Sequence, residues 1–218
     1  MTSLHRLALL LAWVTVPAFL PAQADARAAG WQLRPDDGHT DLTGFTFVER
    51  RPGWQLTTGR FSGIVFHPER TGVGTYESVT TIAQFPVSPQ RLEGYGVFVG
   101  GKDLIGPTQE YTYFLIRHDG RFLIKGRRGT STTTLVDWTP SPAIRQLPAN
   151  AGASSSVSNT LIVRVAADSV TFLINGTQVS RLASAGLSLT GVAGIRANHG
   201  LNLHFSDLSL ATPGRPAQ

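Results

Sequence analysis

Three observations predict an all-β fold of two packed antiparallel sheets. Apolar residues occur in runs of strand length, and nowhere do they recur at helical spacing over a dozen positions. The 218 residues include 23 glycines and 13 prolines, which suits short strands joined by tight turns. Two dipeptides typical of hairpin turns, Asp119-Gly120 and Asn175-Gly176, each lie between such runs. Hydrophobic residues make up 41% of the chain, enough for the core of one sandwich domain.

Residues 1–24 have the pattern of a secretory signal peptide. A basic start that includes Arg6 precedes an apolar run at 7–20, and small residues follow it up to Ala24. Pro17 interrupts the run, which is also shorter than the ~20 residues that a membrane-spanning helix needs. The sequence therefore predicts a secreted or periplasmic protein without a membrane span.

The net charge and the absence of cysteine limit which partners and which kinds of chemistry are expected. The chain has no cysteine, which excludes disulfides, thiolate metal sites and a cysteine nucleophile. Its formal net charge of +5 favours anionic partners, but the arginines are scattered and no nucleic-acid-binding motif occurs. Nucleic acid is therefore not an expected partner, and no feature indicates an oligomeric state.

Residues 25–52 are expected to form an N-terminal extension that ends with a first strand at 45–48. Within this extension, residues 36–41 read Asp-Asp-Gly-His-Thr-Asp. Their carboxylates suit a calcium ion, but the spacing does not match an EF-hand loop. A solvated turn is therefore favoured, with calcium as the alternative, and no other cofactor is expected.

The sandwich itself is predicted over residues 53–212, followed by a disordered tail at 213–218. Outside its central stretch, the expected strands share alternating apolar residues and turn-forming ends, and they lie at residues 54–57, 61–66, 76–85, 135–138, 159–165, 170–174, 177–182, 192–197 and 201–210. The last two strands are expected to pair with each other. The alternation shifts after Ser206, which predicts a bulge there.

The densest pattern lies at residues 93–128, where strands are expected at 95–99, 110–117 and 122–126. Asp119-Gly120 predicts a two-residue turn that places Ile116 opposite Leu123. In that register one face carries Tyr111, Tyr113, Leu115, Phe122 and Ile124. Neither face is polar, so we expect a core on one side and an aromatic groove on the other.

Two phrases resemble those of known sandwiches: FLINGTQV at 172–179 and GIRANHGLNLHFSDLSL at 194–210. They are similar to the shared hairpin and closing strands of concanavalin A-like domains, of the laminin-G and legume-lectin-like kind. The nearest resemblance, over residues 54–210, is to bacterial domains of the 3-keto-disaccharide hydrolase type, long catalogued as a domain of unknown function. The resemblance implies a jelly-roll sandwich that acts on or binds carbohydrate.

Several side chains of the kinds that bind sugars lie in or near the expected strand at 110–117. Planar aromatics stack on pyranose faces, while amide, carboxylate and guanidinium groups bind hydroxyls in pairs. The candidate ligand-binding residues are Tyr111, Tyr113, Arg117, Trp138, Lys102, Asp103 and Gln109. The expected function is non-covalent carbohydrate binding in an aromatic groove, and for each residue a core or loop role is the alternative.

Motifs of the common catalytic classes are absent. The sequence has no Glu-x-Asp-x-x-Glu pattern, no Gly-x-Ser-x-Gly elbow and no His-Glu-x-x-His, so no catalytic residue is assigned and an enzyme is not favoured. The first alternative is a glycoside-processing hydrolase of the resembled type, whose carboxylates would be Glu93 and Glu110. Such a pair must lie about 5 to 10 Å apart.

A second alternative is a laminin-G-like protein-interaction module, which would expose an apolar patch.

Near the closing strands, His199 and His204 are suited to line a groove or to bind a metal. A metal needs a third ligand that the sequence does not show, so no metal is assigned and surface roles are favoured.

Overall fold

The computed structural model describes residues 25–36, 41–88, 91–148 and 150–212. The predicted signal peptide at 1–24 and the predicted tail at 213–218 lie outside these residues. The one helix in the described part is the short 3₁₀ turn η1 (Ala26–Ala29). No described helix has the length and apolar character needed to cross a membrane.

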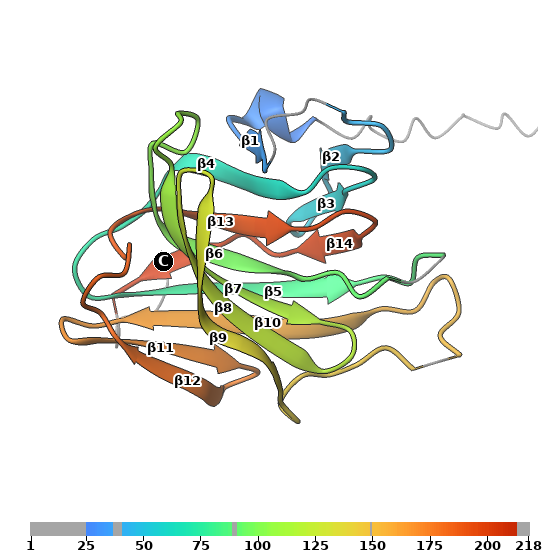
Figure 1. The fold of residues 1–218 in the computed structure, drawn as a ribbon. Helices are drawn as coiled ribbons and strands as arrows, with labels where there is room; N and C mark the ends of the chain where they lie inside the picture. Colours follow the sequence, from blue (N-terminus) through green and yellow to red (C-terminus); the bar gives the residue numbers. More distant parts are fainter. Residues whose placement is uncertain (1–24, 37–40, 89–90, 149, 213–218) are drawn as a thin grey trace, which may run out of the picture.

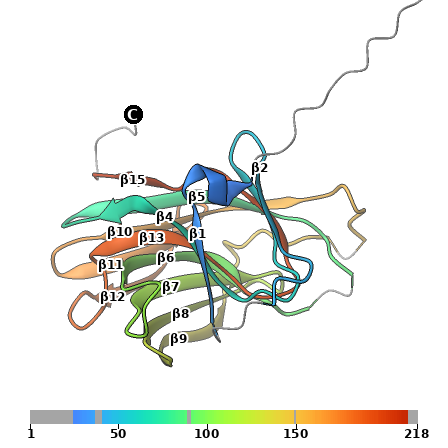
Figure 2. The same ribbon diagram turned by 90° about the horizontal axis from the view of Figure 1, so that it is seen from above.

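Two antiparallel sheets pack face to face, which confirms the predicted all-β sandwich (Figures 1 and 2). The seven-stranded sheet has the spatial order β1 (Gln32–Pro35), β4 (Gly63–Gly72), β13 (Gly191–Ala197), β6 (Tyr95–Lys102), β7 (Glu110–Arg117), β8 (Arg121–Arg128) and β9 (Ser131–Pro140). The eight-stranded sheet has the order β12 (Thr177–Ala183), β11 (Ser169–Ile174), β10 (Val157–Val165), β5 (Tyr76–Gln84), β14 (Asn202–Phe205), β3 (Trp54–Thr57) and β2 (Thr46–Glu49), and β15 (Ser209–Ala211) also pairs with β5.

The sandwich takes in residues that precede position 53. Strand β1 pairs with β4, and β2 pairs with β3. Trp31 is 4% exposed, and its ring packs against Phe47 and Phe205 at centroid distances of 5.3 and 5.7 Å. Part of the expected N-terminal extension is therefore a structural part of both sheets.

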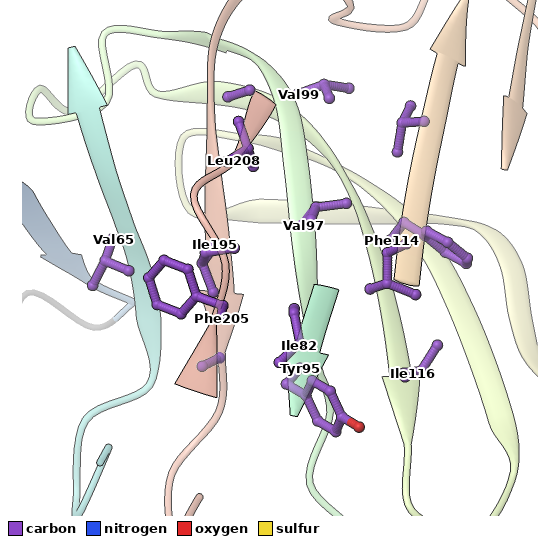
Figure 3. Packing of buried hydrophobic residues seen from close by; sticks show 14 of the residues in the cluster. Val65, Ile82, Tyr95, Val97, Val99, Phe114, Ile116, Ile195, Phe205 and Leu208 are labelled. Atoms are coloured by element: carbon purple, nitrogen blue, oxygen red, sulfur yellow. The ribbon is translucent and has the colours of Figure 1, made fainter. Parts of the chain in front are cut away.

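The main core fills the space between the sheets (Figure 3). Val97, Phe114 and Ile195 point into it from the seven-stranded sheet, and Ile82 and Phe205 from the eight-stranded sheet. In β5 buried and half-buried residues alternate without a break, as expected for a strand with one face on the core. Side chains from both sheets interdigitate here, and their burial provides the main stabilisation of the fold.

The register predicted for the β7–β8 hairpin is wrong by one residue. Ile116 lies opposite Phe122, and the loop has three residues instead of two. Only Gly120 in this loop has positive φ, at 78°, and its N–H donates to the carbonyl of Arg117 over 3.1 Å. A type I turn followed by a left-handed glycine makes a three-residue hairpin loop.

The corrected register moves residues to the opposite face. Phe122 and Ile124 point into the main core, whereas Leu123, Lys125 and Arg127 share a face with Tyr111, Tyr113 and Leu115. By contrast, the two-residue turn predicted at Asn175-Gly176 is confirmed. Both of its residues have positive φ, at 52° and 83°, and Ile174 lies opposite Thr177.

The predicted pairing of the last two strands is wrong, because β13 and β14 belong to different sheets. Strand β13 pairs with β4 and β6, and β14 pairs with β3 and β5. The segment between them therefore crosses from one sheet to the other. Where a bulge was predicted after Ser206, the strand is interrupted instead: β14 ends at Phe205, and β15 resumes pairing with β5 at Ser209.

Candidate functional site

The face of the seven-stranded sheet that points away from the main core, called the outer face, carries a second apolar cluster. Aromatic rings follow one another across β4, β6 and β7, with centroid distances of 6.4 Å for Phe66–Phe98, 5.1 Å for Phe98–Tyr111 and 5.8 Å for Tyr111–Tyr113. The cluster is completed by Ile64, Leu104, Leu115 and Leu123, with Trp138 and Val192 at its margin. These aromatic rings are buried, so they form an apolar cluster on the outer face.

Charged side chains cover the middle of these rings. The Asp36 cluster consists of Asp36, Arg127, Arg196, Tyr111 and Tyr113. Arg196 donates two hydrogen bonds to the Asp36 carboxylate, of 2.8 and 2.7 Å, and Arg127 donates a third of 2.9 Å. The Arg196 guanidinium also lies 4.7 Å from the Tyr113 ring centroid and donates to the Tyr111 hydroxyl over 3.2 Å.

Burial and charge set the protonation states in the Asp36 cluster. Burial alone would raise the pKa of Asp36, but hydrogen bonding and the charges of Arg196 and Arg127 outweigh it and hold that pKa below its usual value. Burial would lower the pKa of Arg196, but its hydrogen bonds to Asp36 raise that pKa overall. Burial raises the pKa of Tyr111 and of Tyr113. The cluster is therefore a carboxylate held by two guanidinium groups, with two neutral phenols next to Arg196.

The depressed pKa of Asp36 predicts sensitivity to acid. A carboxyl group whose pKa is lower in the folded than in the unfolded protein stabilises the fold at pH values above its unfolded-state pKa. This stabilisation is lost as the pH falls through the folded-state pKa. We expect the free energy of unfolding to fall below about pH 4, and to fall less in Asp36→Asn. Urea unfolding of both proteins at pH 6 and pH 3 measures the two differences. Asp119 and other carboxyls with lowered pKa contribute equally to both proteins, so identical pH dependence would contradict the prediction.

Asp36 is not part of the solvated turn that its sequence suggested. Its side chain is only 26% exposed, because it is clamped between the two arginines. Residues 37–40 of the acidic segment lie outside the described residues. Within the described ranges, no three histidine, aspartate or glutamate side chains are grouped so as to hold a metal ion.

A second group on the outer face, the Trp138 patch, lies at the end formed by the β7–β8 turn. It consists of Arg117, Asp119, Arg121 and Trp138. The Arg117 guanidinium is 4.3 Å from the Trp138 ring centroid and donates two hydrogen bonds, of 2.9 and 2.6 Å, to the Asp119 carboxylate. Arg121 donates to the Trp138 carbonyl over 3.1 Å and lies 3.7 Å from Asp119.

The Trp138 patch is held in place but reaches solvent. Trp138 is half-buried, and the Asp119 and Arg121 side chains are 26% and 44% exposed. A Cβ atom at Gly94 would lie 3.0 Å from the Trp138 ring, so the glycine lets the indole lie close to the start of β6. The patch therefore presents a planar aromatic beside a paired carboxylate and guanidinium, which can bind a ring with hydroxyl groups.

The other predicted ligand-binding residues lie elsewhere. Tyr111, Tyr113 and Gln109 are 1%, 4% and 2% exposed, so they offer no free surface in this conformation. Lys102 is exposed at the far end of β6, opposite Glu110 in register. Next to it, Asp103 shapes the following loop, because its carboxylate accepts a 2.9 Å hydrogen bond from the Thr108 N–H.

The two glutamates considered as a catalytic pair are far apart. Lys102 lies opposite Glu110 and Tyr95 opposite Ile116, so Glu93 and Glu110 sit near opposite ends of neighbouring strands. At ~3.3 Å per residue the row of Tyr95 and Ile116 is about 20 Å from Glu110, and Glu93 lies two residues beyond that row, so the separation is much larger than that of a glycosidase pair. The hydrolase alternative therefore receives no support from these two residues.

The two histidines near the closing strands do not face each other across a metal site. His199 pairs with Glu93 over 2.8 Å, and it lines a pocket of about 540 Å³ together with Arg60 and Arg91. His204 bonds to the carbonyl of Arg50 over 2.9 Å. Each ring thus has a separate polar partner.

Comparison with solved structures identifies the architecture, whereas no protein-family model and no curated protein sequence matches the chain. The carbohydrate-binding module CBM66 from Bacillus subtilis superposes with a TM-score of 0.58 at 9% identity, over 84% of this chain and 95% of that one. A protein of unknown function with a galectin-like fold, also from Bacillus subtilis, has a TM-score of 0.55 at 12% identity, over 88% and 93%. The fold is a concanavalin A-like jelly roll.

A third jelly roll, a candidate glycosyl hydrolase from Parabacteroides distasonis, has a TM-score of 0.50 at 12% identity, over 83% of this chain and 99% of that one. At such identities the likeness concerns the fold alone. Only the side chains of this jelly roll can therefore indicate what it binds.

Sequence reasoning missed Asp36, Arg127 and Arg196 as members of the site. One signal was available, because Arg196 is a single charged residue inside the apolar strand β13. A charge buried in that way requires a partner of opposite sign. The sequence does not name that partner, since Asp36 lies 160 residues away.

Proposed function

We propose that this chain is an exported jelly-roll domain that binds carbohydrate non-covalently on the outer face of its seven-stranded sheet. The observation that carries the proposal is the Trp138 patch, where a half-buried indole lies beside the ion pair of Arg117 and Asp119. The proposal places the ligand contact at the turn end of the groove that the sequence suggested, away from the buried tyrosines.

The chemistry of the patch matches that of a sugar ring. A pyranose has an apolar C–H face that stacks on an aromatic ring, and its hydroxyls both donate and accept hydrogen bonds. Asp119 accepts from such hydroxyls, and the exposed Arg121 donates to them. Arg117 is pre-organised by its two bonds to Asp119, so little side-chain entropy is lost on binding.

Two further observations support the proposal. One structural neighbour over most of the chain is by its name a carbohydrate-binding module. The expected signal peptide at 1–24 suits a protein that meets polysaccharide outside the cytoplasm. An interaction module is less well supported, because the exposed large apolar side chains of the described part, Val73, Leu92 and Ile105, lie in three different loops.

Replacing Trp138 with alanine is expected to weaken carbohydrate binding about tenfold, since loss of an aromatic platform costs about 1.4 kcal/mol. A glycan array of the mature protein identifies a ligand, and titration calorimetry with that glycan then compares the variants. Trp138→Phe keeps a planar ring and should retain most of the affinity. Lys102→Ala, at the far end of the sheet, should bind as the wild type does.

The experiment tests carbohydrate binding and the location of the binding site separately. If the wild-type protein binds no glycan, carbohydrate binding itself is contradicted. If it binds one and Trp138→Ala leaves the affinity unchanged, the location of the site is wrong. Thermal unfolding of each variant shows whether a loss of binding reflects a loss of fold.

A further inference from the structure

The pocket lined by His199, called the His199 pocket, is built on two tight turns. Its volume of about 540 Å³ lies within the range of ligand sites, about 300 to 1,000 Å³. Gly59 and Gly200 belong to its lining, and both have positive φ, at 53° and 69°. The Gly200 N–H donates to the Gly59 carbonyl over 2.8 Å. Two turns without side chains therefore meet here and leave room for a ligand.

Basic side chains from three segments line this pocket. Arg60 comes from the β3–β4 connection, Arg91 from the β5–β6 connection, and His199 from the segment between β13 and β14. Among the described residues of the lining there is no aspartate or glutamate. Guanidinium groups bind the paired oxygens of a carboxylate or a similar oxyanion, so this lining suits an acidic group.

These basic side chains are within reach of a ligand. Arg91 is exposed, and the side chains of Arg60 and His199 are 75% and 44% exposed. Asp41 accepts a 3.2 Å hydrogen bond from Arg60, and Glu93 lies 2.8 Å from His199, but neither carboxylate lines the pocket. Arg91 has no carboxylate partner within the part of the chain that the structure describes, so its charge is available to a ligand.

The His199 pocket and the Trp138 patch lie at the same end of the seven-stranded sheet. Tyr95 lies opposite Ile116 of β7 and Ala197 of β13, so β6 begins where both neighbouring strands end. Arg117 of the patch is the last residue of β7, and His199 follows the end of β13 by two residues. Neighbouring strands are about 4.8 Å apart, which puts the ends of β7 and β13 roughly 10 Å from each other.

The segment that precedes β6 contacts both features. A Cβ atom at Gly94 would lie 3.0 Å from the Trp138 ring, and the Asn198 N–H donates to the Gly94 carbonyl over 3.0 Å. The preceding residue, Glu93, is the ion-pair partner of His199. Trp138 and His199 therefore lie against the same two-residue segment, one from each side.

We propose, on the basis of the function proposed above, that the carbohydrate is an acidic oligosaccharide whose carboxylate or sulfate binds in the His199 pocket. A neighbouring sugar ring of the same molecule then lies on Trp138. Arg60 and Arg91 bind the acidic group. Because the two strand ends are about 10 Å apart, the ligand is a chain of sugars and not a single ring.

A glycan array of the full mature chain tests the charge of the ligand. It carries neutral galactan, carboxylate-bearing oligogalacturonate and alginate, and sulfate-bearing carrageenan oligosaccharides. Calorimetry then compares the acidic oligosaccharide that binds most tightly with its carboxyl-reduced or desulfated form. The acidic form should bind about tenfold more tightly at low ionic strength, and added salt should reduce the difference. The carboxylate and sulfate arms show which oxyanion is bound.

Substitutions then locate the acidic group. Arg91→Ala and Arg60→Ala each remove an exposed cation, and each should weaken binding of the acidic oligosaccharide about tenfold. Binding of its neutral form and the melting temperature should stay close to those of the wild type. Arg128→Ala is the matched control, since Arg128 is 69% exposed and lies opposite Glu110 at the far end of the sheet. Trp138→Ala should weaken binding of both forms.

The possible failures can be told apart. Equal binding of the acidic and the neutral form, or binding of neutral glycans only, overturns the acidic ligand and leaves the proposed function in place. If no glycan binds, both are contradicted. If Arg60→Ala and Arg91→Ala keep the preference for the acidic form, the His199 pocket does not bind it. If Trp138→Ala weakens binding of neither form, the pocket and the patch do not share a ligand.

Discussion

Replacing Asp36 with alanine is expected to lower the free energy of unfolding by about 3 to 5 kcal/mol. The substitution leaves Arg196 and Arg127 on the outer face without their shared counter-charge, and their side chains are each only 7% exposed. Removing one partner of a buried ion pair is costly because the remaining charge cannot regain its hydration. Urea denaturation at pH 7 measures the change.

Asp41→Ala is the matched control for this experiment. Asp41 also pairs with an arginine, Arg60, at 3.2 Å, but the two side chains are 46% and 75% exposed. Exposed pairs contribute about 0 to 1 kcal/mol, so this variant should remain close to the wild type. Equal, small losses in the two variants would show that the Asp36 cluster does not stabilise the fold.

Phe114→Ala is expected to destabilise the protein by about 3 to 5 kcal/mol, because it opens a cavity in the main core. Phe114 is fully buried on β7 (Figure 3), and its ring centroid lies 5.3 Å from that of Phe172 in the opposite sheet and 6.1 Å from that of Phe122. The cavity would lie between the two sheets, where neighbouring side chains collapse only in part. Thermal and urea unfolding measure the loss.

Val73→Ala provides the comparison for the core variant. Val73 is 69% exposed in the β4–β5 turn, and its truncation should change stability by no more than about 0.5 kcal/mol. A loss in Phe114→Ala no greater than that in Val73→Ala would contradict the assignment of Phe114 to the centre of the core.

Part of the candidate site could be predicted from the sequence, because alternate residues of a strand point to the same face of the sheet. Strand alternation put Tyr111, Tyr113 and Arg117 on one face, and the structure places them together on the outer face. Trp138 joins them there from β9. The exposure of these side chains did not follow from the sequence. Arg196 lies on both tyrosines, which are buried, whereas Trp138 is half-buried.

The register of the β7–β8 hairpin could not be predicted because its turn residues are compatible with two loop lengths. Asn-Gly and Asp-Gly both favour positive φ, but Asn175 adopts it and Asp119 does not. Two-residue and three-residue loops differ by one position, and a shift of one position reverses which face every residue of a strand occupies. That shift decides that Arg127 reaches Asp36 and that Phe122 enters the main core.

The sequence by itself determined the all-β class, the positions of most strands and the tight turn at Asn175-Gly176. These depend on period-two alternation and on turn residues, which act between near neighbours in the chain. Only the tertiary structure decided that β13 and β14 lie in different sheets and that Asp36 pairs with Arg196. Those features depend on contacts between distant segments, which the two packed sheets bring together and which no local pattern encodes.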